Sequence, residues 1–231
     1  MMRDNVLSEL TMADRLDGAI VIYPGFRQTT GPRTGVFTLH DRISHSFPDR
    51  NHHLLLLRPW NTNHRADAER IEYADPVTTV VVGYSYGCGW AVPQLAKHLR
   101  RKGRYIDALF LIDPVPRYRL LPAKALSLSR FGKYTVPANV RSVWCWRSAN
   151  KAKWTSPVGR PIRKLGSQTT IVSQQVLGSL ANLERYEMRY RDAWQVNDVV
   201  SHVNIDDLKE IHDVIVGAIP KVFARLSHDN L

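Results

Sequence analysis

At 231 residues the chain is long enough to bury a substantial core, and we expect one α/β domain spanning residues 1–231. No apolar run approaches the roughly 18 residues of a membrane-spanning helix, and Met1–Asn5 leads into polar sequence instead of the apolar core of a signal peptide, so we expect a cytoplasmic protein. The formal net charge of +11 has one source: Pro114–Leu183 has no Asp or Glu but holds twelve of the 32 Lys and Arg residues.

Apolar stretches rich in β-branched residues and leucine alternate with helical patterns along the chain. The predicted strands are Ala19–Tyr23, His53–Leu57, Val77–Val82, Ala108–Ile112 and Val140–Trp146, with a sixth beginning at Thr169–Val172. The predicted helices are Arg65–Tyr73, Trp90–Lys102 and Asp206–Leu226, the last with apolar residues at helical spacing. Uniformly apolar strands that alternate with helices predict an α/β fold: a mostly parallel sheet of about six strands, with helices on both faces.

The most informative motif is Gly83-Tyr84-Ser85-Tyr86-Gly87. It follows the β-branched run Thr78–Val82 and precedes a predicted helix, which is the strand-to-helix context of a nucleophile elbow. In such a turn glycines flank a serine whose backbone is strained and whose hydroxyl is exposed at the sheet edge. We therefore predict Ser85 as a nucleophile; the alternative is a glycine-rich turn that merely contains a serine.

A serine nucleophile needs a base, and the base needs a group that orients it. Asp113 ends the strand after the elbow helix, at the edge where reactive side chains of a parallel sheet gather. It could instead cap a turn before Pro114. We favour the catalytic role because the next strand ends in Arg147-Ser148-Ala149-Asn150, which contains no carboxylate.

His202 is the predicted base, because it lies late in the chain in the segment just before the last predicted helix. His212, inside that helix, is the alternative and reads more readily as a packing residue. The predicted order is therefore Ser85, Asp113, His202.

Acyl transfer also needs two backbone N–H groups directed at the developing oxyanion. Tyr86, the residue after the nucleophile, is one expected donor. The other should come from the loop after the first strand, most readily from Phe26, because Pro24 has no N–H and Gly25 permits the tight turn.

With these residues in place, the chain resembles the α/β-hydrolase superfamily over nearly its whole length, as a compact member. The position of the predicted acid, after the strand that directly follows the elbow helix, is similar to that in thioesterase domains and some small esterases. The resemblance implies a carboxylesterase or thioesterase. Two features depart from it: Tyr84 stands where thioesterase elbows commonly have histidine, and there is no His-Gly-Gly oxyanion motif.

In that superfamily the corresponding segment commonly forms a lid, and residues 114–137 are the candidate here. Five of its residues are basic, and several leucines give it an apolar side. Such charges often form only a solvated face. Twelve cations without a compensating acid would also attract anions, so an anionic ester, an acyl-coenzyme A, an acyl carrier protein or an anionic membrane surface are candidate partners.

Two function classes remain open on these residues. The leading one is a serine hydrolase that cleaves a carboxylic ester or thioester through an acyl-enzyme. The alternative is a hydrolase-like binding module whose basic 114–183 segment engages a polyanion. Nucleic acid is the less favoured polyanion, because Trp144 and Trp146 share a strand face and should pack in the fold. We expect no metal and no cofactor, and we read Cys88 and Cys145 as reduced core thiols.

Overall fold

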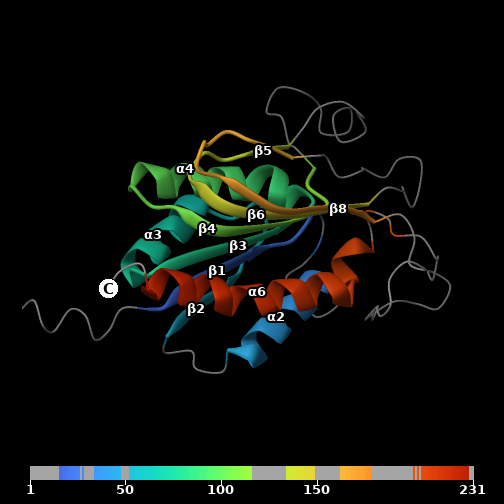
Figure 1. The fold of residues 1–231 in the computed structure, drawn as a ribbon, viewed down its shortest axis with the longest axis horizontal. Coiled ribbons are helices and arrows are strands. Elements are labelled where there is room, and N and C mark those ends of the chain that lie inside the picture. Colours follow the sequence, from blue (N-terminus) through green and yellow to red (C-terminus); the bar gives the residue numbers. More distant parts are fainter. Residues whose placement is uncertain are drawn as a thin grey trace, which may run out of the picture.

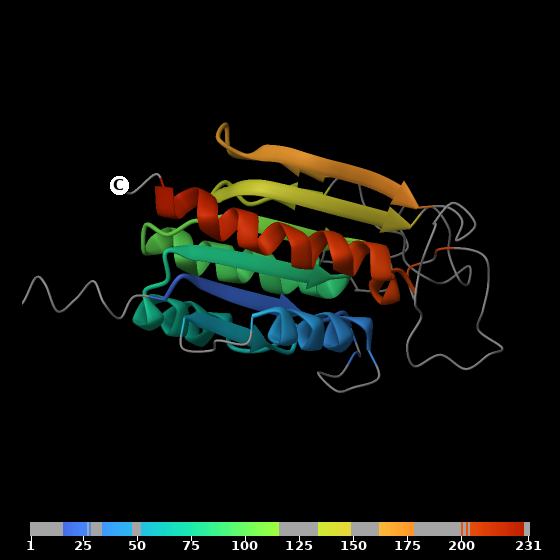
Figure 2. The same cartoon turned by 60° about the horizontal axis from the view of Figure 1, so that its bottom comes forward.

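The computed structural model of the protein describes residues 16–26, 28, 34–47, 52–115, 134–148, 162–177, 200, 202 and 204–228. Its centre is a sheet of six strands in the order β2-β1-β3-β4-β6-β8, every neighbouring pair parallel. The strands are β1 (Gly18–Tyr23), β2 (His53–Leu57), β3 (Thr78–Tyr84), β4 (Ile106–Ile112), β6 (Val140–Ser148) and β8 (Thr170–Leu177). Figure 2 shows their arrowheads pointing to one side, so their carboxyl ends form a common edge.

Helices cover both faces of this sheet (Figure 1). The helices on one face are α3 (His64–Ala74) and α4 (Val92–Arg101), and those on the other are α2 (Gly35–Ser46) and α6 (Lys209–His228). Alternate side chains of one strand enter the two cores: Ala19 and Val21 face α3 and α4, whereas Ile20 and Ile22 face α2 and α6. The expected α/β fold, a parallel sheet of about six strands with helices on both faces, is confirmed.

The six predicted strands all form, and two of them extend beyond their predicted carboxyl ends. β3 continues to Tyr84 and β6 continues to Ser148, so both reach the edge where the polar residues gather. The elbow helix begins later than predicted, because a π-helical turn at Gly87–Ala91 precedes α4. The last helix also begins later, at Lys209, after a 3₁₀ turn at Ile205–Asp207 that ends at an extended Leu208.

Two features were not predicted. Helix α2 begins after Thr34, whose hydroxyl accepts a hydrogen bond from the Phe37 amide at 3.2 Å, as an N-cap should. A separate two-stranded parallel sheet pairs β5 (Tyr134–Val136) with β7 (Ile162–Lys164). Three-residue strands are too short to leave a period-2 pattern in the sequence.

Most of the candidate lid at 114–137 cannot be compared with the structure, because residues 116–133 lie outside the described residues. Its last part contains β5, where the buried Tyr134 donates a hydrogen bond to the Cys88 carbonyl at 2.9 Å. None of the helices in the described ranges is long and apolar enough to cross a membrane.

Alanine substitutions at two glycines should have opposite effects on the stability of the fold. A Cβ at Gly35 would lie 2.1 Å from the Asp206 carbonyl oxygen, whereas one at Gly217 in α6 would have nothing within 4 Å. We expect Gly35→Ala to lower the free energy of unfolding by about 1–3 kcal/mol through overpacking. Gly217→Ala should raise it by about 0.5–1 kcal/mol, because alanine loses less backbone entropy in a helix. Urea denaturation measures both, and a Gly35→Ala protein as stable as the parent would contradict the close approach.

Candidate active site

Ser85 stands in a strained turn between β3 and the π-helical turn that leads into α4. Its φ is 51°, the left-handed region that a residue with a side chain enters only where the surroundings impose it. Its amide donates to the Ile112 carbonyl at 3.0 Å, and its carbonyl accepts from the Gly89 amide at 3.1 Å. Gly87 is required here, since a Cβ would lie 2.3 Å from the Tyr23 carbonyl oxygen. The predicted elbow geometry is therefore present.

The structure brings the Ser85 hydroxyl to His202. The distance from Ser85 Oγ to His202 Nε2 is 2.8 Å, and both residues are buried. His202 lies shortly before the 3₁₀ turn Ile205–Asp207, so the segment that leads into α6 carries the imidazole to the end of β3. The alternative base, His212, lies elsewhere: its Nε2–H donates to the Asp206 carbonyl at 2.7 Å, a contact within its own segment.

Asp113 lies on the far side of the imidazole from Ser85. Its Oδ2 is 2.6 Å from His202 Nδ1, and the residue is fully buried. Its φ is 46°, so the chain turns sharply at the end of β4, and its amide donates to the Trp146 carbonyl at 2.7 Å. Asp113 thus lies where the sequence predicts a triad acid, within hydrogen-bonding distance of the predicted base.

The bond to Asp113 fixes the histidine tautomer. A carboxylate only accepts, so Nδ1 must carry the proton and donate it. Nε2 of the neutral imidazole then has a lone pair facing the Ser85 hydroxyl, 2.8 Å away. This arrangement can remove a proton from Ser85 and hold the resulting imidazolium against a buried anion.

Ser148 is a site residue that sequence reasoning missed. It ends β6, and its amide and hydroxyl donate to Asp113 Oδ1 and Oδ2, each at 2.7 Å. The sequence predicts that a strand ends near Ser148, but nothing about a serine at a strand end indicates a contact with Asp113.

Tyr84 is a second residue whose contact was missed. Its hydroxyl donates to the His202 carbonyl, and its ring is stacked on the imidazole with centroids 5.4 Å apart and an interplanar angle of 26°. Tyr84 therefore holds both the backbone and the ring of His202. The tyrosine noted in the sequence as a departure from thioesterase elbows therefore contacts the predicted base directly.

The two predicted oxyanion residues lie side by side. The Phe26 and Tyr86 rings have centroids 5.3 Å apart, and a Cβ on Gly25 would lie 3.1 Å from the Ser85 Cβ, so the loop after β1 lies directly against the nucleophile. The Gly25 amide already donates to Gln28 Oε1 at 2.9 Å. With Gly25 engaged and Pro24 lacking an N–H, Phe26 stays the predicted loop donor.

Gln28 joins this loop to the segment that carries the base. Its Oε1 holds the Gly25 amide, and its Nε2 donates to Asp206 Oδ2 at 2.8 Å. Asp206 in turn accepts from His212 through its carbonyl. One amide side chain therefore ties the expected oxyanion loop to the turn just after His202, although the two are far apart in the sequence.

The two thiols are free and buried, as the sequence predicts. Burial raises the pKa of the Cys145 thiol to about 12 and that of the Cys88 thiol well above its ordinary value. Both therefore stay protonated near neutral pH. Within the part of the chain that the structure describes, no cluster of His, Cys, Asp and Glu could hold a metal ion.

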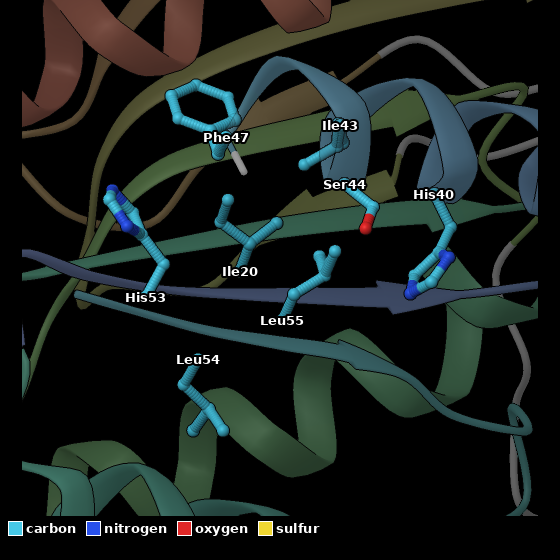
Figure 3. Close-up of a pocket in the computed structure, with 8 residues that line it drawn as sticks. All are labelled: Ile20, His40, Ile43, Ser44, Phe47, His53, Leu54 and Leu55. Carbon is cyan, nitrogen blue, oxygen red and sulfur yellow. The ribbon is translucent and has the colours of Figure 1, made fainter. Parts of the chain in front are cut away.

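A separate cavity of about 230 Å³ lies between α2 and the edge strand β2 (Figure 3). His40 and Ser44 of α2 face it from one side, and His53 and Leu55 of β2 from the other. None of the five predicted site residues lines it, so this cavity is not the space next to Ser85.

No protein-family model matches the chain, and no curated protein matches it. Among solved structures, it is similar to the RedJ thioesterase from the prodiginine pathway of Streptomyces coelicolor, with 14% identity and a TM-score of 0.43 over 70% of this chain and 77% of that chain. It is also similar to alpha/beta hydrolase domain-containing protein 10 from mouse, with 10% identity and a TM-score of 0.46 over 90% of each chain. Likenesses this distant carry no inference about activity, and the fold assignment rests on strand order and the turn at Ser85.

The contact between Tyr84 and His202 predicts the behaviour of a hydroxyl deletion. Tyr84→Phe keeps the stacked ring and removes the donor to the His202 carbonyl. We expect kcat for a short p-nitrophenyl ester to fall by about tenfold, the effect of about 1.4 kcal/mol. The denaturation midpoint should also fall, because a buried hydrogen bond is lost, so rates are normalised to folded protein. Tyr105→Phe, at an exposed tyrosine remote from Ser85 in the sequence, is the matched control. Equal kcat values for the two variants would show that the hydroxyl does not hold the base.

Proposed function

We propose that the protein is a serine hydrolase that cleaves a carboxylic ester or thioester through an acyl-enzyme. One observation carries the proposal: a continuous hydrogen-bonded chain from Ser85 Oγ to His202 Nε2 at 2.8 Å and from His202 Nδ1 to Asp113 Oδ2 at 2.6 Å. The chain starts at a serine with positive φ in a strand-to-helix turn, as nucleophilic serines of this fold do.

In the first half-reaction Ser85 Oγ attacks the substrate carbonyl carbon while His202 Nε2 takes the hydroxyl proton. The carbonyl oxygen becomes an oxyanion, for which the Phe26 and Tyr86 amides are the proposed donors. Collapse of this intermediate breaks the bond to the alcohol or thiol, which leaves with the proton from His202. Asp113 stabilises the imidazolium throughout by accepting from Nδ1.

In the second half-reaction water takes the place of the leaving group. His202 Nε2 removes a proton from the water, whose oxygen attacks the acyl carbon on Ser85. Collapse releases the carboxylic acid and returns the proton to Ser85 Oγ. The nucleophile, the base, the acid that orients the base and the proposed oxyanion donors in both halves are all residues of this chain.

A fluorophosphonate probe tests the proposal directly, because it phosphonylates only an activated serine. We expect a single adduct on Ser85 of the folded protein and none on Ser85→Ala. Ser85→Ala should also lower the hydrolysis of a short p-nitrophenyl ester by at least about a thousandfold. A folded parent protein without an adduct would reject the enzyme and favour the binding-module alternative.

The assignment of the base is tested by two histidine variants. His202→Ala should be nearly as damaging to kcat as Ser85→Ala, because the serine then lacks an acceptor for its proton. His212→Ala removes a buried contact with the Asp206 carbonyl, so we expect a lower denaturation midpoint but kcat per folded molecule within about threefold of the parent. Rates are normalised to folded protein by circular dichroism. The reverse order of kcat values would assign the base to His212.

We further propose that the substrate is anionic, on the basis of the acid-free stretch Pro114–Leu183. Rising salt should then lower kcat/KM for an acyl-coenzyme A or a carboxylate-bearing ester and leave a neutral ester of the same acyl chain unchanged, since the Debye length is about 8 Å at physiological salt. Reversal of Arg117, Arg119 and Lys124 to Glu should slow only the anionic substrate. Identical salt curves for the two substrates would reduce the stretch to a solvated face.

A further inference from the structure

We infer that Ser148 is a positioning residue for the proposed hydrolase: its hydroxyl fixes the orientation and the charge distribution of the Asp113 carboxylate. The inference rests on the proposed function, because it assigns Asp113 the task of holding His202. It gives a role in the chemistry to a residue that itself touches neither Ser85 nor His202 in any hydrogen bond of the described residues.

Among the described residues, three donors meet the Asp113 carboxylate, and Ser148 supplies two of them. The Ser148 amide donates to Oδ1, and the Ser148 hydroxyl and His202 Nδ1 share Oδ2. Asp113 is 0% exposed and Ser148 1%. A buried carboxylate is stable only when its charge is met by donors, and two bonds from one residue on its two oxygens also prevent rotation of the carboxylate plane.

The sheet itself holds Ser148 in place. β4 and β6 are paired up to Ile112 and Trp146, after which Asp113 turns away while β6 continues for two more residues. Ser148 is still paired with Leu177 of β8. The Phe110 ring stacks on Trp144 at 4.7 Å, and this contact between β4 and β6 fixes their relative position. The donor is therefore part of a rigid strand and not of a loop.

Sharing Oδ2 has a chemical consequence. The Ser148 hydroxyl draws electron density from the oxygen that holds the imidazole, so it weakens that oxygen as an acceptor. Without the hydroxyl, Oδ2 would stabilise the imidazolium form of His202 more strongly. The acid limb of the pH profile of kcat/KM, which reports protonation of the free base, should then move to higher pH.

The other groups near this pair do not titrate in the same range. The Cys88 and Cys145 thiols lie near Asp113, and burial raises the pKa of both, so they stay neutral. Arg147 is always charged, and the Tyr84 hydroxyl donates a hydrogen bond to the His202 carbonyl. Near neutral pH a shift of the acid limb therefore reports on His202 and its carboxylate.

The test is the pH dependence of kcat/KM in Ser148→Ala, Ser148→Thr and a control on the same strand, Ser142→Ala. We expect Ser148→Ala to lower kcat by about tenfold or more and to move the acid limb upward by about half a pH unit or more. Ser148→Thr keeps a hydroxyl and should keep the limb of the parent, as should Ser142→Ala. NMR titration of the His202 imidazole should show the same upward shift in Ser148→Ala without any turnover.

An unchanged limb in folded Ser148→Ala would overturn the inference. So would a shift to lower pH, because a merely loosened structure weakens the contact with Asp113 and disfavours the imidazolium. Should Ser148→Ala fail to fold, Ser148→Cys replaces the hydroxyl by a weak donor of similar shape, and the absence of an upward shift there overturns the inference equally. Failure of the proposed function gives a different result: neither the parent protein nor any variant at position 148 would then form a fluorophosphonate adduct.

Discussion

The hydrogen bond from the Ser85 amide to the Ile112 carbonyl is the contact on which the site depends. It joins the ends of β3 and β4 at the point where both strands stop, and the residue after each pairing, Ser85 or Asp113, has positive φ. Two left-handed turns on adjacent strands redirect two side chains to one place above the sheet edge. The strain of each turn is balanced by the ladder beneath it, which includes the Asp113 amide bonded to the Trp146 carbonyl.

The His202 imidazole lies between these two side chains and contacts both, and other residues of the site keep it there. His202 comes from a segment outside the sheet, so no ladder holds it. Tyr84 supplies the missing constraint through its hydroxyl bond and its stacked ring. Gln28 adds a second tie, from the loop after β1 to Asp206 just beyond the base. The base is thereby held directly by Tyr84 of β3, and the segment that carries it is tied to the loop after β1.

The sequence predicts those parts of the site that have a local signature. The glycines around Ser85 and the apolar run before it fix the elbow, and Asp113 and His202 follow from strand ends and chain order. The supporting contacts have no such signature, because Tyr84 and His202 are 118 positions apart and Ser148 and Asp113 are 35 apart. Helix α2 could have been found, since Thr34 precedes Val36, Leu39 and Ile43 at helical spacing.

The place of the acid directly after β4 also constrains the end of β6. A carboxylate at position 148 would lie within hydrogen-bonding distance of Asp113, and both would be buried away from water. Two such anions cannot both ionise, and one would hold a proton or destabilise the fold. A neutral donor with two hydrogen bonds to give satisfies Asp113 without this conflict. At this position the absence of acids from Pro114–Leu183 is therefore a requirement of the site, independent of any effect that the surplus of cations has on a substrate.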